Sequence, residues 1–60
     1  MTATLPLPDL EQVYDELAQA VDRAGERSEL FLAKLALLLA QELGDRGRLA
    51  ALIVAAEADL

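Results

Sequence analysis

The sequence contains no cysteine and no histidine among its 60 residues. Without cysteine no disulfide can form, and nothing in the sequence indicates an oxidising compartment. With histidine also missing, only carboxylates remain as strong metal ligands, so we expect no metal site and no cofactor. A chain this short buries only about 60% of its unfolded surface and usually needs a disulfide, a metal or oligomerisation to be stable. Since disulfides and metal sites are excluded, association with another chain is the remaining way to stabilise a chain of this composition.

Positive charge is also scarce, with five Lys and Arg against eleven Asp and Glu and a net charge of −6. Nucleic acids and anionic membrane surfaces attract clusters of Lys and Arg, so we expect neither as a partner. The apolar run "LFLAKLALLLA" at residues 30–40 is shorter than the roughly 20 residues that a membrane span needs. The opening "MTATLPLPD" lacks the positive residue and apolar core of a signal peptide. We therefore expect a cytoplasmic protein.

The first third of the chain has the spacing of an amphipathic helix preceded by prolines. The "LPLPD" segment predicts an extended, partly mobile lead-in over residues 1–8. Asp9, with Gln12 three residues later, has capping-box spacing and predicts the N-cap of a helix over residues 10–24. Gly25 is the expected left-handed end of this helix.

Two further helices follow, and no strand pattern is present. They are expected over residues 27–43 and 46–58, with Gly44 ending the first and Asp45 capping the second. Residues 9–60 would then form one helical domain. The sequence thus predicts an all-α fold: a small three-helix bundle, or a helical hairpin with a lead-in helix, completed by association.

The two later helices carry more apolar surface than a small domain can cover. On residues 27–43 one side is expected to pack inward; its members are Leu32, Leu35, Ala36, Leu39 and Leu43. A narrow polar stripe lies nearly opposite, and large apolar side chains border it on both flanks. The last helix reads "LAALIVAA" over residues 49–56, without a polar side chain. We expect the surplus to bind a protein partner through Arg27, Leu30, Phe31, Lys34, Leu37, Leu38 and Val54.

No pattern in the sequence indicates catalysis. The paired carboxylates Asp15 and Glu16 lie on the polar face of the first helix, where solvation is expected. Ser28 resembles the attachment serine of acyl carrier proteins only in following a helix joint, because Arg27 and Glu29 depart from their Asp-Ser-Leu motif. We therefore expect no catalytic residue and no enzyme activity, and the carrier reading is the weaker alternative.

Two segments, "DLEQVYDELAQA" at 9–20 and "FLAKLALLLAQELGD" at 31–45, carry a family resemblance. Together they resemble the short bacterial family catalogued as domain of unknown function 2783. The matching positions are Asp9, Tyr14, Leu17, Ala33, Leu35, Leu37, Leu38, Leu39, Ala40, Gly44 and Asp45. The sequence departs from the family pattern at three positions. Lys34 replaces an arginine, Leu32 replaces an asparagine and Val21 replaces a histidine. The resemblance implies an accessory role beside flavin-dependent aromatic hydroxylases or metal-dependent hydrolases.

The leading hypothesis from the sequence is a non-catalytic interaction module, most simply an accessory subunit. It would dock on and stabilise a larger cytoplasmic enzyme, for which the resemblance suggests a flavin-dependent aromatic hydroxylase. The alternative is a homodimeric helical bundle with a structural or regulatory role. Both hypotheses need the surplus apolar surface of the last two helices to be covered by another chain.

Overall fold

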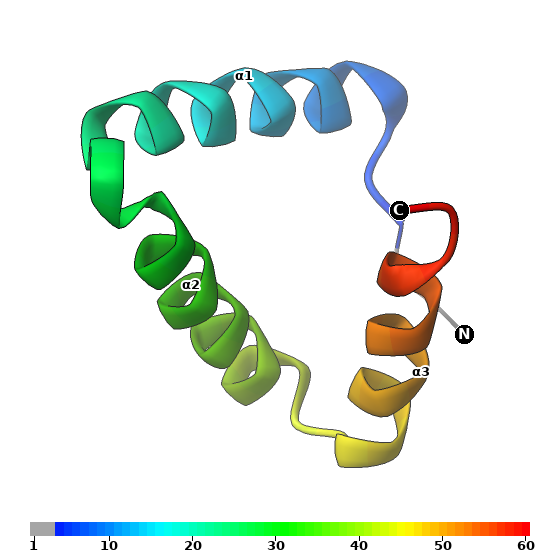
Figure 1. Ribbon diagram of the computed structural model, residues 1–60. Helices are drawn as coiled ribbons and strands as arrows, with labels where there is room; N and C mark the ends of the chain where they lie inside the picture. The colour runs from blue at the N-terminus through cyan, green and yellow to red at the C-terminus, as the bar shows by residue number, and fades with distance from the viewer. Residues whose placement is uncertain (1–3) are drawn as a thin grey trace.

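The computed structural model describes residues 4–60 and contains three α-helices joined by short turns (Figure 1). Helix α1 spans Leu7–Ala24, α2 spans Ser28–Leu43 and α3 spans Arg46–Glu57. A single 3-10 turn, η1, spans Gly25–Arg27 between α1 and α2. No residue of 4–60 lies in a strand. The predicted all-α fold class is confirmed, in its open, hairpin-like form.

Helix α1 begins earlier than the sequence indicates. Pro6 is its N-cap and makes no side-chain cap, and the Leu10 amide donates to the Pro6 carbonyl at 2.9 Å. The prediction that Asp9 caps the helix is wrong, as is the extended conformation expected for residues 7 and 8. Pro8 fits the first turn because its missing N–H would have no helical partner there and its φ suits a helix. Residues 1–3 of the expected lead-in lie outside the described residues.

Gly25 breaks what would otherwise be one long helix. Its amide donates to the carbonyl of Val21, and its φ of 58° and ψ of −122° lie in a region open mainly to glycine. The predicted positive φ is confirmed, but ψ differs from that of a left-handed helical cap. Because of this ψ, the chain turns through η1 and α2 leaves at an angle to α1 (Figure 1).

The joint between α2 and α3 is formed as the sequence predicts. Gly44 has φ 68° and ψ 24°, the left-handed conformation, and its amide donates to the Ala40 carbonyl at 2.9 Å. Asp45 is the N-cap of α3, and its Oδ1 accepts from the Arg48 amide at 3.0 Å. Two residues therefore end one helix and start the next.

Replacing Asp45 with alanine should destabilise α3. The substitution removes the only side-chain cap that the three helices have among the described residues, at an expected cost of about 1 kcal/mol. Urea denaturation at a fixed protein concentration measures the change. Asp22→Ala is the matched control, since this exposed carboxylate caps no helix. An equal loss in both variants would contradict the capping role.

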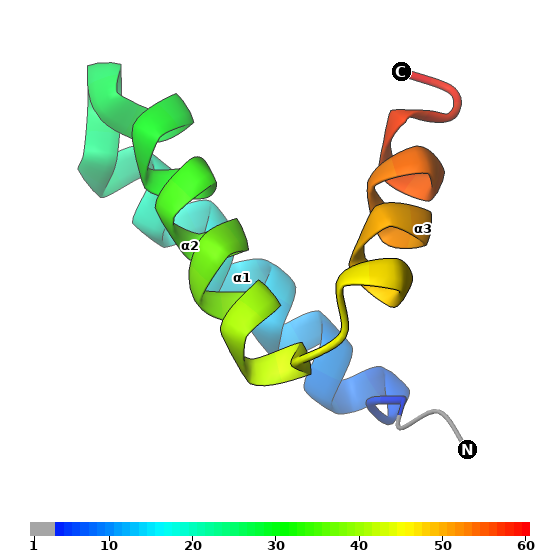
Figure 2. The ribbon, with the colours of Figure 1, turned by 90° about the horizontal axis from the view of Figure 1, so that it is seen from below.

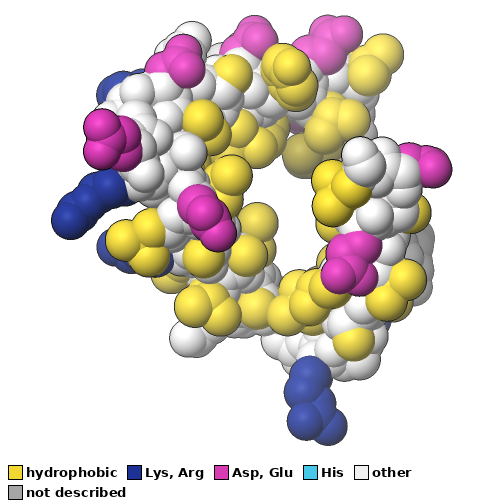
Figure 3. Space-filling view, in the orientation of Figure 1, with side chains coloured by type: hydrophobic (Ala, Val, Ile, Leu, Met, Phe, Trp, Pro, Cys, Tyr) yellow, Lys and Arg dark blue, Asp and Glu magenta, His cyan; other side chains and the backbone are white. Residues whose placement is uncertain are grey.

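The helices surround an opening and do not close into a bundle. No Cα atom of α1 comes within 8 Å of one in α3, and α2 approaches its neighbours only near the joints. Figure 2 shows α3 diverging from α2, and Figure 3 shows apolar side chains around a central opening. The radius of gyration is 12.8 Å, against about 10 Å for a compact chain of this length. The molecule is a loosely packed helical hairpin.

The expected internal seam of α2 is mostly exposed, so that prediction is wrong in detail. Of its members only Leu35 and Leu43 are half-buried, whereas Leu39 is 57% exposed. Phe31 takes an inward place instead, because the turn at Gly25 directs α1 toward the Phe31 side of α2. Tyr14 on α1 is 72% exposed.

No side chain within residues 4–60 is buried. The accessible surface is 5636 Å², whereas a compact folded protein of 6.4 kDa exposes about 3,800 Å². Each chain thus carries about 1,800 Å² more surface than a compact fold of its size would show. Large apolar side chains are exposed on all three helices, and this surface indicates association with a partner.

Candidate interaction surface

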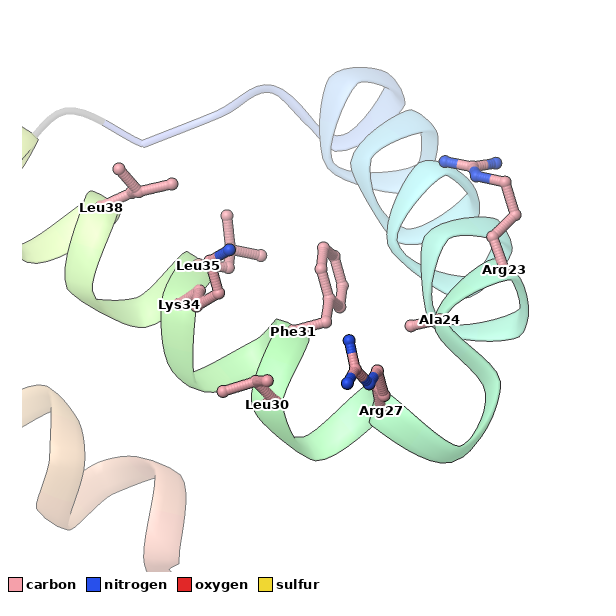
Figure 4. Close-up of a pocket in the computed structure, with 8 residues that line it drawn as sticks. All are labelled: Arg23, Ala24, Arg27, Leu30, Phe31, Lys34, Leu35 and Leu38. Carbon is pink, nitrogen blue, oxygen red and sulfur yellow. The ribbon is translucent and has the colours of Figure 1, made fainter.

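A groove of about 430 Å³ lies where α1 meets α2 (Figure 4). We call it the α1–α2 groove. Its lining residues are Arg23, Ala24, Arg27, Leu30, Phe31, Lys34, Leu35 and Leu38. Two come from the last turn of α1, one from η1 and five from α2. The turn at Gly25 creates the groove because it brings the end of α1 beside the first turns of α2.

Phe31 is the central apolar side chain of the groove. Its ring stands between the helices, and the methyl group of Ala24 points toward it from α1 (Figure 4). Leu35 and Leu38 continue on the same side of α2 as Phe31. Phe31 and Leu35 are half-buried, whereas Leu30 and Leu38 are exposed. The groove therefore offers a partly supported aromatic side chain flanked by free leucines, a usual composition for a docking site.

The rim of the groove is positive although the chain as a whole is acidic. Arg23, Arg27 and Lys34 line it, which is three of the five cationic residues of the sequence. No Asp or Glu lines it. All three cationic side chains are exposed, and positive groups beside an apolar floor favour a partner that brings both aliphatic side chains and carboxylates.

Five of the seven residues expected at the interface line this one groove: Arg27, Leu30, Phe31, Lys34 and Leu38. The other two lie elsewhere. Leu37, 69% exposed, borders a second hollow at the α2–α3 joint, and Val54, 67% exposed, lies on α3. The expected interface is thus divided between the groove and α3.

Three further residues line the groove although no pattern in the sequence by itself indicates them there: Arg23, Ala24 and Leu35. Leu35 was assigned to the internal seam, and the first two belong to a helix whose direction depends on the turn at Gly25. The spacing of Arg23 four residues before Arg27 was the available signal. It could be used only with the angle between α1 and α2 known.

The acidic side chains lie on the solvent-exposed surface. All eleven carboxylates are exposed, so none lies in the desolvated kind of site that general acid–base catalysis uses. Gln12 Nε2 donates to Glu16 Oε2 at 3.5 Å, a contact on the outer face of α1. Within residues 4–60 no three potential ligands are grouped to hold a metal ion. The absence of enzyme activity stays a prediction.

None of the described helices is long and apolar enough to cross a membrane. Comparisons with known proteins found no matching family model, no matching curated protein and no matching solved structure. The resemblance to the domain of unknown function 2783 family therefore depends on the motif residues of the sequence alone.

Proposed function

We propose that this protein is a non-catalytic interaction module whose helices gain a core only by packing against another polypeptide. The observation that supports this best is the absence of any buried side chain in residues 4–60. A large aliphatic side chain gains about 1.5–3 kcal/mol when it is fully buried. Among the exposed ones, Leu30, Leu37, Leu38 and Val54 each leave more than half of their surface uncovered. Their burial is comparable in free energy to the whole stability of a small domain.

Docking of a helix into the α1–α2 groove is the proposed mechanism. The partner helix would place aliphatic side chains on Phe31 and the neighbouring leucines, and carboxylates near the positive rim. The outer face of α1, with exposed Asp15 and Glu16, would remain in water. If the docked helix comes from a larger cytoplasmic protein, the module is an accessory subunit that stabilises it. If it comes from a second copy of the chain, the module is a homodimer with a structural or regulatory role. The family resemblance makes a flavin-dependent aromatic hydroxylase the first enzyme to test.

Co-expression tests this function. The chain is produced alone and with such a hydroxylase, and the mass of each species is measured by light scattering. We expect the chain to elute above its 6.4 kDa monomer mass in at least one of the two samples. Phe31→Asp should remove that association, and Gln19→Asp, an equal gain of charge on the exposed side of α1, should not. A 6.4 kDa monomer with strongly protected amides in both samples would contradict the proposal.

A further inference from the structure

Helix α3 is an apolar helix without a partner. It reads "RGRLAALIVAAE", and every residue after Leu49 is exposed. A helix that lacks a polar face is normally surrounded by other protein. Among residues 4–60, α3 touches other elements only near the joint at residues 44–45, and it diverges from α2 beyond that (Figure 2). The molecule thus has both an unfilled groove and an uncovered helix.

We propose that two copies of this chain associate about a two-fold axis, each placing its α3 in the α1–α2 groove of the other. The inference rests on the proposed interaction function and names its partner as a second copy. A two-fold arrangement uses the same pair of surfaces twice, so one event covers both grooves and both α3 helices. A foreign helix in the groove would leave α3 exposed.

The dimensions of the two surfaces agree. From Arg27 in η1 to Leu38 in α2 the groove is about 16 Å long at helical rise. Helix α3 has 12 residues and is about 18 Å long. Its small side chains, Ala50, Ala51 and Ala55, permit close approach of the helix backbones. Val54 is 67% exposed and lies on the same face of α3 as Ala50 and Ala51, so it can pack on the leucines that flank Phe31.

The charges of the two surfaces are complementary in only one relative orientation of the helices. Helix α3 has Arg46 and Arg48 in its first turn and Glu57 as its last residue. Arg23 and Arg27 lie at the end of the groove where α2 begins, and Glu42 lies near the other end of α2. An α3 antiparallel to the partner's α2 therefore places Glu57 near Arg27 and Arg46 near Glu42. The parallel alignment would bring like charges together at both ends.

The area also fits a permanent dimer. Obligate homodimers bury roughly 2,000–5,000 Å² in total. Each chain of 5636 Å² exposes about 1,800 Å² beyond a compact fold, so two chains have about 3,600 Å² to bury. This excess is large enough for both grooves and both α3 helices to be covered.

Mixing two defective variants tests the exchange. Phe31→Asp damages the groove, and Val54→Asp damages α3. Loss of a hot-spot side chain raises a dissociation constant at least about thirtyfold per site, and hence about a thousandfold for a dimer that contains the site twice. In the mixture the heterodimer has one intact site, formed by the Val54→Asp groove and the Phe31→Asp α3. Its other site carries both substitutions, and because these two side chains would pack on each other, their losses overlap and the second substitution costs little at a site that the first has already broken. The heterodimer therefore loses about one site, whereas each homodimer loses two. We expect native mass spectrometry to show the heterodimer in clear excess over both homodimers.

A charge exchange provides a second test for variants that still fold. Arg27→Glu and Glu57→Arg should each weaken the dimer, about three- to tenfold, and the double variant should recover most of this loss. Gln19→Asp is the control that adds charge outside the groove. No recovery in the double variant would overturn the antiparallel alignment.

The outcomes separate this inference from the proposed function. A wild-type dimer without preferential heterodimer formation would overturn the exchange of α3, since it would indicate groove-to-groove or α3-to-α3 contact. A chain that binds only a different protein would overturn the second copy as partner but leave the interaction function standing. A stable, compact 6.4 kDa monomer, with α3 folded back on its own α2, would overturn both.

Discussion

On dilution from about 100 µM to about 1 µM, the chain alone should lose most of its helical circular dichroism signal. Isolated helices of 12–18 residues are marginal in water, and here no side chain of residues 4–60 is buried to support them. If the core forms only between chains, folding and association are one equilibrium. The melting temperature should then rise with protein concentration. Circular dichroism at matched path length and temperature measures both effects.

A covalent tandem of two copies is the control for the dilution experiment. A flexible linker makes association intramolecular, so the tandem should keep its helical signal at all concentrations tested. Loss of signal from the tandem as well would indicate adsorption or another artefact of dilution. Full helicity of the single chain at the lowest concentration, with a melting temperature independent of concentration, would contradict association-dependent folding.

Replacing Gly25 with alanine should change the shape of the molecule. No atom lies within 4 Å of the position that a Cβ would take, so crowding is no obstacle. The obstacle is the backbone, because φ 58° with ψ −122° costs an alanine about 1–3 kcal/mol. Alanine also favours a helix by about 1 kcal/mol over glycine. We therefore expect α1, η1 and α2 to join into one continuous helix.

The consequences of a continuous helix are large enough to measure in solution. A helix from Leu7 to Leu43 would be about 55 Å long, whereas the longest dimension is now 34 Å. Ala24 and Phe31 would move apart, and the α1–α2 groove would disappear with them. Small-angle X-ray scattering should show the lengthening. We expect binding through the groove to be lost in the same variant.

Gly47→Ala is the matched control for Gly25→Ala. Gly47 lies in the first turn of α3, and a Cβ there would meet Asp45 Oδ1 at 3.5 Å, an ordinary contact. This substitution should stabilise α3 by up to about 1 kcal/mol and leave the scattering profile unchanged. If Gly25→Ala also left the profile unchanged, the requirement for glycine at the α1–α2 turn would be contradicted.

Local signals in the sequence placed the helices well. Gly44 and Asp45 predicted the α2–α3 joint because a left-handed C-terminal residue and an aspartate cap depend only on neighbouring residues. The predicted start of α1 was wrong for an equally local reason. Asp9 with Gln12 has the spacing of a cap, but Pro8 is itself well suited to a first helical turn and lets the helix begin before it.

The groove could be predicted only in part. Spacing around Lys34 identified Leu30, Phe31 and Leu38 as surplus apolar surface, and the structure brings them to one place. The spacing of apolar residues in the sequence cannot show that α1 contributes to that groove, because this contribution depends on the angle between α1 and α2. The opposite side of α2 was expected to be internal, since a helical projection shows which residues share a face but not what covers it.

The sequence by itself determined the helical content, the helix joints and the excess of apolar side chains. These follow from periodicity, caps and composition, which act over a few residues. The tertiary structure decided the angle at Gly25, the inward position of Phe31 and the separation of α3 from α1. Those features depend on the dihedral angles of one glycine and on contacts between helices, and no local pattern specifies them. The same separation leaves α3 available to a second chain.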